Sequence, residues 1–480
     1  MGTQCPKRLW LYKKRPELRA ELSDSQQLIF EKGTDVGLLA RELFQGGKDA
    51  TPSDYRHFDE AFQMTADWVA SGAPVIYEAA FMHNGVMAAL DILVRKRGRW
   101  YGYEVKSSTE IKDYQVRDAA VQYYVIQAAG VELQDFSIIH LNNAYTREGE
   151  LDLDQLFTIQ SVRKEILALQ EEIPAKVDAF KTLLRSRKEP NIEIGTHCSD
   201  PYPCEFMDYC WSHIPDVSVF SLSNMRAKKK FELYGQGIIE FHQLPEGYSL
   251  TAAQQLQVRC CQENRAHTDP EKIWAWLKQL SWPLYFMDFE TFMPAVPLYA
   301  QSRPFQHIPF QFSVHVQATP RSGLKHLEYL GEPEKDPRPA FIKQLLAALG
   351  DKGSILVYNK AFEITRLREL QTLYPRLKKP IDQVINRITD LMEPFQQKWY
   401  YHPAMNGSYS IKQVLPALVP ELSYKDLEIG EGGTAMAAFE GLLKIGDKTE
   451  KEKIRKKLLE YCGLDTWAMV KILERLKSLE

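Results

Sequence analysis

Leu284-Tyr285-Phe286-Met287-Asp288-Phe289-Glu290 is an apolar stretch that carries two acidic residues at alternate positions. A β-strand places alternate side chains on the same face, so Asp288 and Glu290 are expected to project together. Burying two carboxylates in an apolar strand is costly unless a cation compensates for their charge. The stretch therefore predicts a buried strand of a mixed α/β domain, with a metal ion as the simplest compensation.

Further acidic residues follow this strand on separate predicted elements. Glu363 lies near the start of a predicted helix that follows a strand, and Tyr461 and Asp465 lie one turn apart in the predicted helix 450–476. Residues four apart share one face of a helix. Each piece alone also fits an edge strand, a helix start or an ordinary surface tyrosine.

In this order the set resembles the DnaQ-like, DEDD-type exonucleases of the RNase H fold. The resemblance implies a two-metal displacement with the metal ligands Asp288, Glu290 and Asp465. Tyr461 would orient the attacking water, as in the tyrosine subclass. The family's second motif normally ends in aspartate, whereas this chain has Glu363, and Asp390 is an alternative fourth ligand.

The block Gly407-Ser408-Tyr409-Ser410-Ile411-Lys412 has two interpretations. It fits a loop on the substrate side followed by a helix start, or it fits helix-capping chemistry alone. The capping interpretation is favoured, because serine is a preferred residue before a helix.

A second acidic set lies nearer the N-terminus, in Glu104-Val105-Lys106. Strand alternation puts Glu104 and Lys106 on one face. Asp91 and Glu78 lie on two other predicted strands, and carboxylates that converge from paired strands form an oxygen-rich pocket for Mg²⁺ or Mn²⁺. A neighbouring lysine can position water or offset charge on a phosphate. The alternative is a set of exposed charges on edge strands.

With a following helix that carries Gln122, this set resembles the PD-(D/E)XK core of RecB-family nucleases. The resemblance implies that Asp91 and Glu104 hold metal and that Lys106 is the catalytic lysine. Gln122 would correspond to the family's helix glutamine near the substrate backbone. Glu78 is a candidate for a further metal contact.

Four cysteines bracket this predicted nuclease core: Cys5, Cys198, Cys204 and Cys210. One distant cysteine followed by three close ones resembles the iron–sulfur RecB-like nucleases, including those of CRISPR adaptation and the AddB type. The resemblance implies that four thiolates hold a 4Fe-4S cluster. Zinc in a four-thiolate site and cysteines that bind no metal are the alternatives. The gaps between Cys198 and Cys204 and between Cys204 and Cys210 are both five residues, whereas the family usually has a shorter gap between its second and third cysteines.

Length and hydrophobic pattern predict two α/β units. A chain of 480 residues is long enough for two or three domains. The predicted strands are Val75–Tyr77, Leu90–Val94, Trp100–Val105, Leu284–Glu290, Phe310–Val316 and Ser354–Tyr358. The predicted helices are Gln26–Gly46, Asp118–Gly130, Ala361–Leu373 and Glu450–Leu476. Together with the two resemblances, this pattern leads us to expect a restriction-endonuclease-like domain over residues 1–215, a helical connector over 216–280 and an RNase H-like mixed-sheet domain over 281–480.

The composition of the chain says little about its partners and its location in the cell. The net charge of −3 gives no basic bias that would indicate a nucleic-acid partner, and no apolar stretch reaches the length of a membrane span. We expect a cytoplasmic protein without membrane attachment. Protein partners are not indicated.

The two sets together resemble bacterial fusion proteins that join a RecB-like nuclease to an RNase H-like exonuclease. This resemblance predicts metal-dependent hydrolysis of nucleic acid, DNA rather than RNA and from an end, at two active sites. The alternative is a nucleic-acid-binding scaffold in which one or both sites are inactive.

Overall fold

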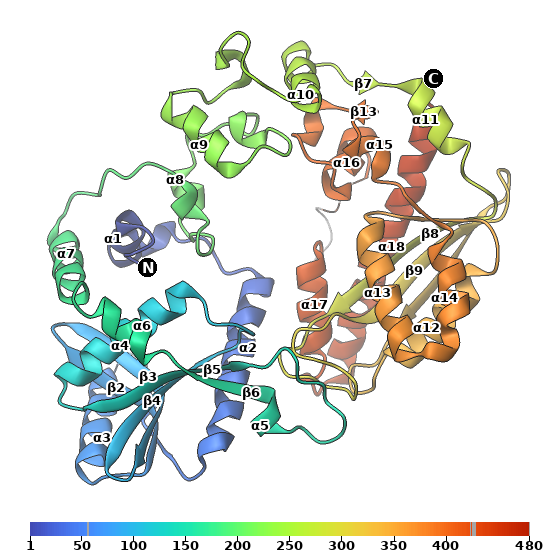
Figure 1. Ribbon diagram of the computed structural model, residues 1–480. Coiled ribbons are helices and arrows are strands. Elements are labelled where there is room, and N and C mark those ends of the chain that lie inside the picture. Colours follow the sequence, from blue (N-terminus) through green and yellow to red (C-terminus); the bar gives the residue numbers. More distant parts are fainter. Residues whose placement is uncertain (55–56, 423, 425–428, 480) are drawn as a thin grey trace. The chain divides into compact units, whose positions relative to one another are not determined.

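The computed structural model describes residues 1–54, 57–422, 424 and 429–479. These residues form an α/β protein with two mixed sheets, of six and five strands, and a long C-terminal helix (Figure 1). The chain divides into two compact units, and each is described by itself. The first unit contains residues 1–209 and 294–306, and the second contains residues 210–293 and 307–480.

The first unit is built on the six-stranded sheet, whose strands follow one another in chain order. They are β1 (Lys48–Asp49), β2 (Val75–His83), β3 (Val86–Lys96), β4 (Arg99–Lys106), β5 (Leu133–Leu141) and β6 (Phe157–Ser161). The β1–β2 and β4–β5 pairs are parallel, and the other neighbours are antiparallel. The acidic residues of the predicted first site lie on β2, β3 and β4.

Helices cover both faces of this sheet. They are α1 (Pro6–Lys14), α2 (Asp24–Arg41), α3 (Phe58–Ala70), α4 (Asp113–Ala128), α5 (Leu153–Leu156), α6 (Arg163–Leu169) and α7 (Ile173–Arg185). One hydrophobic cluster packs α3, α4, α6 and α7 against one face, and a second packs α2 against the other. A capping box at Ser23, in which Ser23 and Gln26 satisfy each other's backbone amides, fixes the start of α2. Helix α8 (Met207–Cys210) lies where the chain passes from one unit to the next.

The segment 294–306 belongs to the first unit although it connects two strands of the second. Ala295, Val296 and Phe305 join the hydrophobic cluster that packs against α2. Arg147 Nη1 donates hydrogen bonds to the carbonyl oxygens of Pro297 and Leu298, at 2.9 and 3.1 Å. These contacts fix the segment as part of the core of the first unit.

The second unit is built on the five-stranded sheet, in the order β10-β9-β8-β11-β12. The strands are β8 (Leu284–Phe292), β9 (Ile308–Gln317), β10 (Leu324–Leu330), β11 (Ser354–Val357) and β12 (Ile388–Asp390). Strands β8, β9 and β10 are antiparallel, whereas β11 runs parallel to both β8 and β12. The separate pair β7 (His267–Thr268) and β13 (Tyr400–Tyr401) is antiparallel.

Alternate residues of β8 enter different hydrophobic clusters. Tyr285, Met287 and Phe289 pack with α12, α13 and α14, whereas Phe286 packs in the cluster that contains α16 and α18. Asp288 and Glu290 therefore lie on the α18 face. The helices of this unit are α9 (Ala227–Gly235), α10 (Ala252–Glu263), α11 (Pro270–Leu277), α12 (Arg338–Leu349), α13 (Lys360–Leu373), α14 (Lys378–Ile385), α15 (Glu393–Gln396), α16 (Ile411–Leu418), α17 (Gly432–Gly441) and α18 (Lys448–Lys477).

Every strand predicted above is confirmed, in β2, β3, β4, β8, β9 and β11, although β11 ends at Val357, one residue before the predicted end at Tyr358. The predicted helices correspond to α2, α4, α13 and α18, although α4 begins five residues earlier, at Asp113, and α2 ends at Arg41. Among the described residues, none of the helices combines the length and the apolar character that crossing a bilayer requires.

Candidate metal centre and a second acidic site

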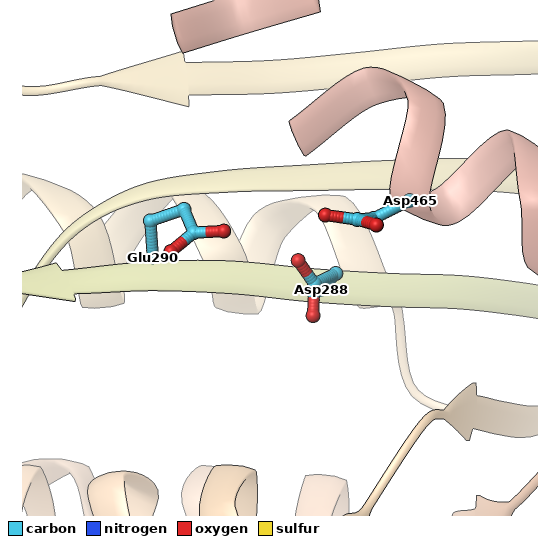
Figure 2. A group of neighbouring side chains, drawn as sticks. All are labelled: Asp288, Glu290 and Asp465. Carbon is cyan, nitrogen blue, oxygen red and sulfur yellow. The ribbon is translucent and has the colours of Figure 1, made fainter. Parts of the chain in front are cut away.

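Three carboxylates of the second unit converge on one point. Asp288 and Glu290 project from β8, and Asp465 projects from α18 toward them (Figure 2). One oxygen of each lies within 4.8 Å of the others. In the part of the chain that the structure describes, this is the only group of three or more potential metal-ligand side chains gathered so closely. An oxygen-only ligand set of this kind suits Mg²⁺ or Mn²⁺.

The triad lines a cavity of about 220 Å³. Glu363, from the first turn of α13, lines the same cavity, is 2% exposed and has an oxygen, Oε2, without a hydrogen-bond partner. A buried carboxylate oxygen without a partner is costly unless a ligand satisfies it. Glu363 therefore fits a fourth carboxylate ligand, despite its extra methylene relative to aspartate.

Burial and mutual repulsion hold protons on these carboxyl groups. Burial, followed by repulsion from Asp465, raises the pKa of Glu290 to about 8. Burial also raises the pKa of Glu363 to about 8 and that of Asp465 to about 6. The pKa of Asp288 is raised well above its ordinary value by burial and by the neighbouring acids. Divalent cations would remove this repulsion, so the electrostatics agree with the ligand geometry.

Two tyrosines flank Asp465. The Tyr424 hydroxyl donates a hydrogen bond to Asp465 Oδ1 at 2.7 Å, and the Tyr461 hydroxyl also favours the charged form of this carboxylate, which lowers its pKa. Tyr461 lines the cavity one turn before Asp465, where the sequence predicts it. Tyr424 was not predicted, because no periodic element surrounds it. Its role follows only from the folded arrangement.

Asp390 lies at the end of β12, and its side chain accepts hydrogen bonds from backbone amides. Its two side-chain oxygens accept hydrogen bonds from the amides of Asn359, Lys360 and Met392, each at 3.0 Å. These bonds hold the start of α13, the helix that carries Glu363. Asp390 does not belong to the converging triad, and its contacts give it a positioning function.

The interpretation of Gly407–Lys412 as helix capping is not supported. Ser410 precedes α16, but its side chain makes no capping hydrogen bond. Ile411 and Lys412 instead line the cavity that contains the triad. The sequence signal for this was present, since the block was also predicted as a loop on the substrate side.

The predicted site of the first unit is formed by the middle of β2 and β3 and by the end of β4. Lys106 Nζ donates to Glu104 Oε1 at 2.8 Å and contacts Asp118 Oδ2 at 3.2 Å, so the predicted common face of Glu104 and Lys106 is confirmed. Burial alone would lower the pKa of Lys106, but the two carboxylates raise it above its ordinary value. Glu104 Oε2 and Gln122 Oε1 are buried without a hydrogen-bond partner.

Asp91 and Glu78 lie opposite each other where the pairing of β2 with β3 is interrupted. The paired residues on either side are Tyr77 with Ile92 and Ala79 with Leu90. Glu78 has a positive φ of 52°, which turns its side chain out of the strand alternation. Asp91 accepts a hydrogen bond from the Val105 amide, and burial followed by repulsion from Glu104 raises its pKa well above the ordinary value.

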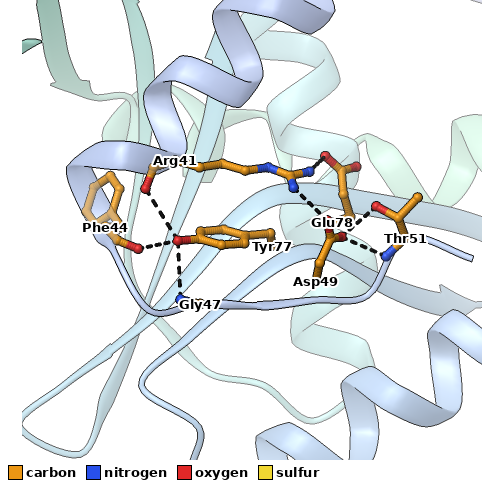
Figure 3. Close-up of polar contacts among 7 residues, drawn as sticks. All are labelled: Arg41, Phe44, Gly47, Asp49, Thr51, Tyr77 and Glu78. Carbon is orange, nitrogen blue, oxygen red and sulfur yellow. Dashed lines mark hydrogen bonds and ion pairs between the residues drawn. The ribbon is translucent and has the colours of Figure 1, made fainter.

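Arg41 compensates for part of this negative charge. Its guanidinium bridges Asp49 Oδ2 at 2.7 Å and Glu78 Oε1 at 2.8 Å (Figure 3). The same guanidinium lies 5.0 Å from the centre of the Tyr77 ring. Arg41 therefore fixes the direction of Glu78, whereas Glu104 forms its ion pair with Lys106.

The predicted cysteine ligands are brought together in part. Gln4, next to Cys5, donates hydrogen bonds to the carbonyl oxygens of His197 and Tyr202, both at 2.8 Å. The amide of Cys204 donates to the Cys198 carbonyl at 2.8 Å. These bonds place Cys5 beside the loop that contains Cys198 and Cys204.

Cys210 ends α8, six residues after Cys204. Over the described ranges the seven cysteines form no disulfide, and the four predicted ligands form no compact group like that of the acidic triad. The metal cluster stays a prediction.

Comparison with known proteins gives relatives without an assigned activity. Residues 285–410 match a family described as "Domain of unknown function (DUF2779)". The chain is similar to "Uncharacterized protein MG366" of Mycoplasma genitalium, with 27% identity over 225 residues, which cover 42% of this chain and 33% of the relative. It is also similar to "Uncharacterized protein UU173" of Ureaplasma parvum, with 25% identity over 219 residues, which cover 40% of this chain and 31% of the relative. The matches therefore span about a third of these relatives' length.

Proposed function

We propose that the protein is a metal-dependent nuclease that hydrolyses phosphodiester bonds at the cavity formed by Asp288, Glu290 and Asp465. The convergence of three carboxylates within 4.8 Å, with Glu363 buried beside them, is the observation that carries this proposal. Such a group has a high electrostatic cost in the folded protein unless it binds cations.

The residues of this cavity divide into two functions. Asp288, Glu290, Asp465 and Glu363 would hold Mg²⁺ or Mn²⁺, which supplies Lewis-acid activation of water and stabilises charge on the phosphoryl oxygens. The Tyr461 hydroxyl lies beside Asp465 at the edge of the cavity, where it would orient the attacking water. Tyr424 and Asp390 would act through other residues, by holding Asp465 and the start of α13.

The strand order supports a finer fold proposal. The sheet of the second unit has three antiparallel strands followed by two parallel ones. Its acidic residues lie on the first strand of this sheet in chain order, β8, and on the last helix, α18. This arrangement fits an RNase H-like exonuclease domain. In the first unit, the acids of β3 and β4 and the packed helix α4 fit a restriction-endonuclease-like domain. We infer the same reaction class at both sites, with nucleic acid as substrate and DNA preferred over RNA.

At the first site, Asp91 and Glu104 would hold metal, with Glu78 as a further contact. Lys106 would contribute its positive charge to the reacting phosphate, and Gln122 would contact the substrate backbone. The buried oxygens of Glu104 and Gln122 that lack partners support a ligand here.

The two sites are tested with single substitutions in the full-length protein. Asp288→Asn and Lys106→Met should each lower the rate of one distinct set of cleavage products by at least about 100-fold, because each removes a group that acts on the reacting phosphate. The measurement is digestion of 5′- and 3′-labelled single-stranded DNA, duplex DNA and RNA with Mg²⁺ and with Mn²⁺.

Asp351→Asn, at an exposed position of the second unit, is the matched control and should leave every product unchanged. A metal-loaded wild type that cuts none of these substrates would contradict the proposal. A nucleic-acid-binding scaffold would then be the better interpretation.

We propose in addition that Cys5, Cys198, Cys204 and Cys210 bind a 4Fe-4S cluster, with zinc as the alternative metal. The hydrogen bonds between Gln4 and the 197–202 loop support this, because they hold the two parts of the motif together. Protein purified without oxygen should show broad visible absorbance that Cys198→Ser removes. A colourless preparation containing stoichiometric zinc would favour the alternative.

A further inference from the structure

Helix α16 begins at the cavity that contains the acidic triad. Ile411 and Lys412, its first two residues, line that cavity. The first amides of an α-helix have no acceptor within the helix. Gln413 and Val414 donate to the Ser410 carbonyl, and the Ser410 side chain does not cap the helix. The amides of Ile411 and Lys412 are therefore available to a ligand in the cavity.

Neighbouring side chains hold the start of α16 in place. The Tyr358 hydroxyl donates to the Tyr409 carbonyl at 2.8 Å, and Tyr358 itself lines the cavity. Two residues earlier, the Gly407 amide donates to the Tyr401 hydroxyl at 3.1 Å, and the Ser223 hydroxyl donates to the Gly407 carbonyl at 2.6 Å. The helix start is thus fixed relative to the cavity before any ligand binds.

Lys412 brings a positive charge into the same cavity. It makes no hydrogen bond or ion pair with another described residue, yet it lies close enough to lower the pKa of both Glu290 and Asp465. An ammonium group beside a metal site repels the metal, so Lys412 weakens cation binding when the cavity contains cations alone. The repulsion is offset when an anion lies between the lysine and the metal.

The carboxylates that line the same cavity favour a bound cation. Glu363 Oε2 is buried without a partner, and the carboxylates of the triad lie beside it. A cavity of about 220 Å³ is therefore lined by carboxylates and also by an ammonium group and the first residues of a helix. Typical pockets for drug-sized ligands measure roughly 300–1,000 Å³, so this cavity is sized for a smaller group.

We propose that Lys412 and the N-terminus of α16 form a phosphate subsite in the cavity that contains the metal-binding carboxylates. Helix N-termini bind phosphate through their free amides and their dipole, and a lysine adds a charged donor. The ligand class is a phosphate ester, namely the reacting phosphodiester or the phosphate of a product nucleotide. That substrate class rests on the proposed nuclease function, whereas the binding of phosphate itself does not.

The test measures two affinities of the full-length protein by titration calorimetry. One is the affinity for Mn²⁺ alone, and the other is the affinity for inorganic phosphate and for thymidine 5′-monophosphate in saturating Mn²⁺. Lys412→Met should weaken thymidine 5′-monophosphate binding by about tenfold, because a charge-assisted contact is lost. The same variant should bind Mn²⁺ more tightly, because a repelling charge is removed.

Two further variants separate a local charge effect from a structural one. Lys412→Arg should restore phosphate binding, and Lys379→Met, at an exposed position on α14, should match the wild type. Circular dichroism checks that each variant folds, and Lys412→Gln replaces Lys412→Met if the latter does not.

The subsite would be overturned if wild type failed to bind either phosphate probe, or if Lys412→Met left nucleotide affinity unchanged. A parallel loss of Mn²⁺ affinity would also overturn it, since a structural defect weakens both ligands. If the opposite shifts occur in a protein that cuts no nucleic acid, the subsite stands and only the proposed hydrolysis fails.

Discussion

At the level of single residues, the carboxyl groups of the second unit retain protons that exposed carboxyl groups lose. The pKa values of Glu290 and Glu363 are raised to about 8, and that of Asp465 is raised to about 6. A metal ion binds the ionised form, so binding must displace these protons. The metal affinity of the site is therefore tied to pH over this range.

We expect Mn²⁺ binding to release protons at pH 7 and to tighten as the pH rises toward about 8. Above that pH the carboxyl groups of Glu290 and Glu363 are already ionised, so the affinity should level off. Titration calorimetry in buffers of different ionisation enthalpy measures the released protons. Glu290→Gln should reduce their number, and proton release equal to that of the wild type would contradict the assignment.

The same raised pKa values fix the sign of the stability change in metal-free protein. Between the ordinary pKa near 4.5 and about 8, folded Glu290 binds a proton that the unfolded chain has lost. The stabilising contribution of this group is therefore complete below the ordinary pKa and is lost as the pH rises through about 8. Metal-free wild type should show a steeper fall of Tm from pH 6 to 9 than Glu290→Gln does.

At the level of elements, a polar network sets the position of α18 on its sheet. The Thr466 hydroxyl, next to Asp465, lies 2.6 Å from Ser313 Oγ and 2.8 Å from His315 Nδ1 on β9. Ser313 pairs directly with Asp288 across β8 and β9. One network thus aligns the strand that carries two acids with the helix that carries the third.

Replacing Thr466 with valine should loosen this alignment without changing side-chain size. Thr466→Val removes a hydrogen-bond partner of both Ser313 and His315, so the free energy of unfolding should fall by about 1–3 kcal/mol. Mn²⁺ affinity should fall by about 10- to 100-fold, as when groups that orient metal ligands are removed. Urea denaturation and calorimetry measure the two effects.

The control is Thr372→Val, whose exposed hydroxyl on α13 contacts only the Arg368 carbonyl of its own helix. A Thr466→Val protein with wild-type Mn²⁺ affinity would show that the network does not position Asp465.

Elements with a strong local pattern could be predicted from the sequence, and the others could not. Strand β8 and helix α18 are long and have a regular pattern, so both elements were predictable from their own sequence. Strand β10 is an edge strand with polar residues such as Lys325 and His326, and β12 has only three residues, so neither stands out in the sequence. Such elements are defined by the strands with which they pair rather than by their own composition.

The same distinction applies to the candidate site. Asp288 and Glu290 were predictable because two carboxylates are costly to bury in an apolar strand, and Asp465 was predictable from the order of acidic residues along the chain. Tyr424 and the backbone-binding function of Asp390 were not, since both depend on residues that meet only after folding. Lys412 was noticed in a motif, but its position on the cavity wall followed only from the packing of α16.

At the level of the whole molecule, residues 294–306 link the integrity of the first unit to the rest of the chain. Replacing them with a Gly/Ser linker of equal length removes the apolar contacts of Phe305 and the acceptors of Arg147. We expect faster amide hydrogen exchange in residues 142–156 of the first unit, because the packing that protects them is lost. Exchange in the core of β8 and α18 should change little.

Mass spectrometry of full-length protein after exchange measures both regions. A Gly/Ser replacement of residues 318–323, an exposed turn between β9 and β10, is the matched control. Unchanged protection of residues 142–156 in the first variant would contradict the structural role of the segment.

Because residues 294–306 belong to the first unit but follow β8 in the chain, they also affect the order of folding during synthesis. A ribosome that has just made residue 209 has synthesised almost all of the first unit but not the segment that completes its second hydrophobic cluster. Domains generally fold as units while the chain emerges, starting from the N-terminus. Here the second hydrophobic cluster of the first unit is complete only after β8 has been made and residue 306 has emerged, so a nascent chain stalled between residues 210 and 290 would expose apolar surface around α2 to chaperones.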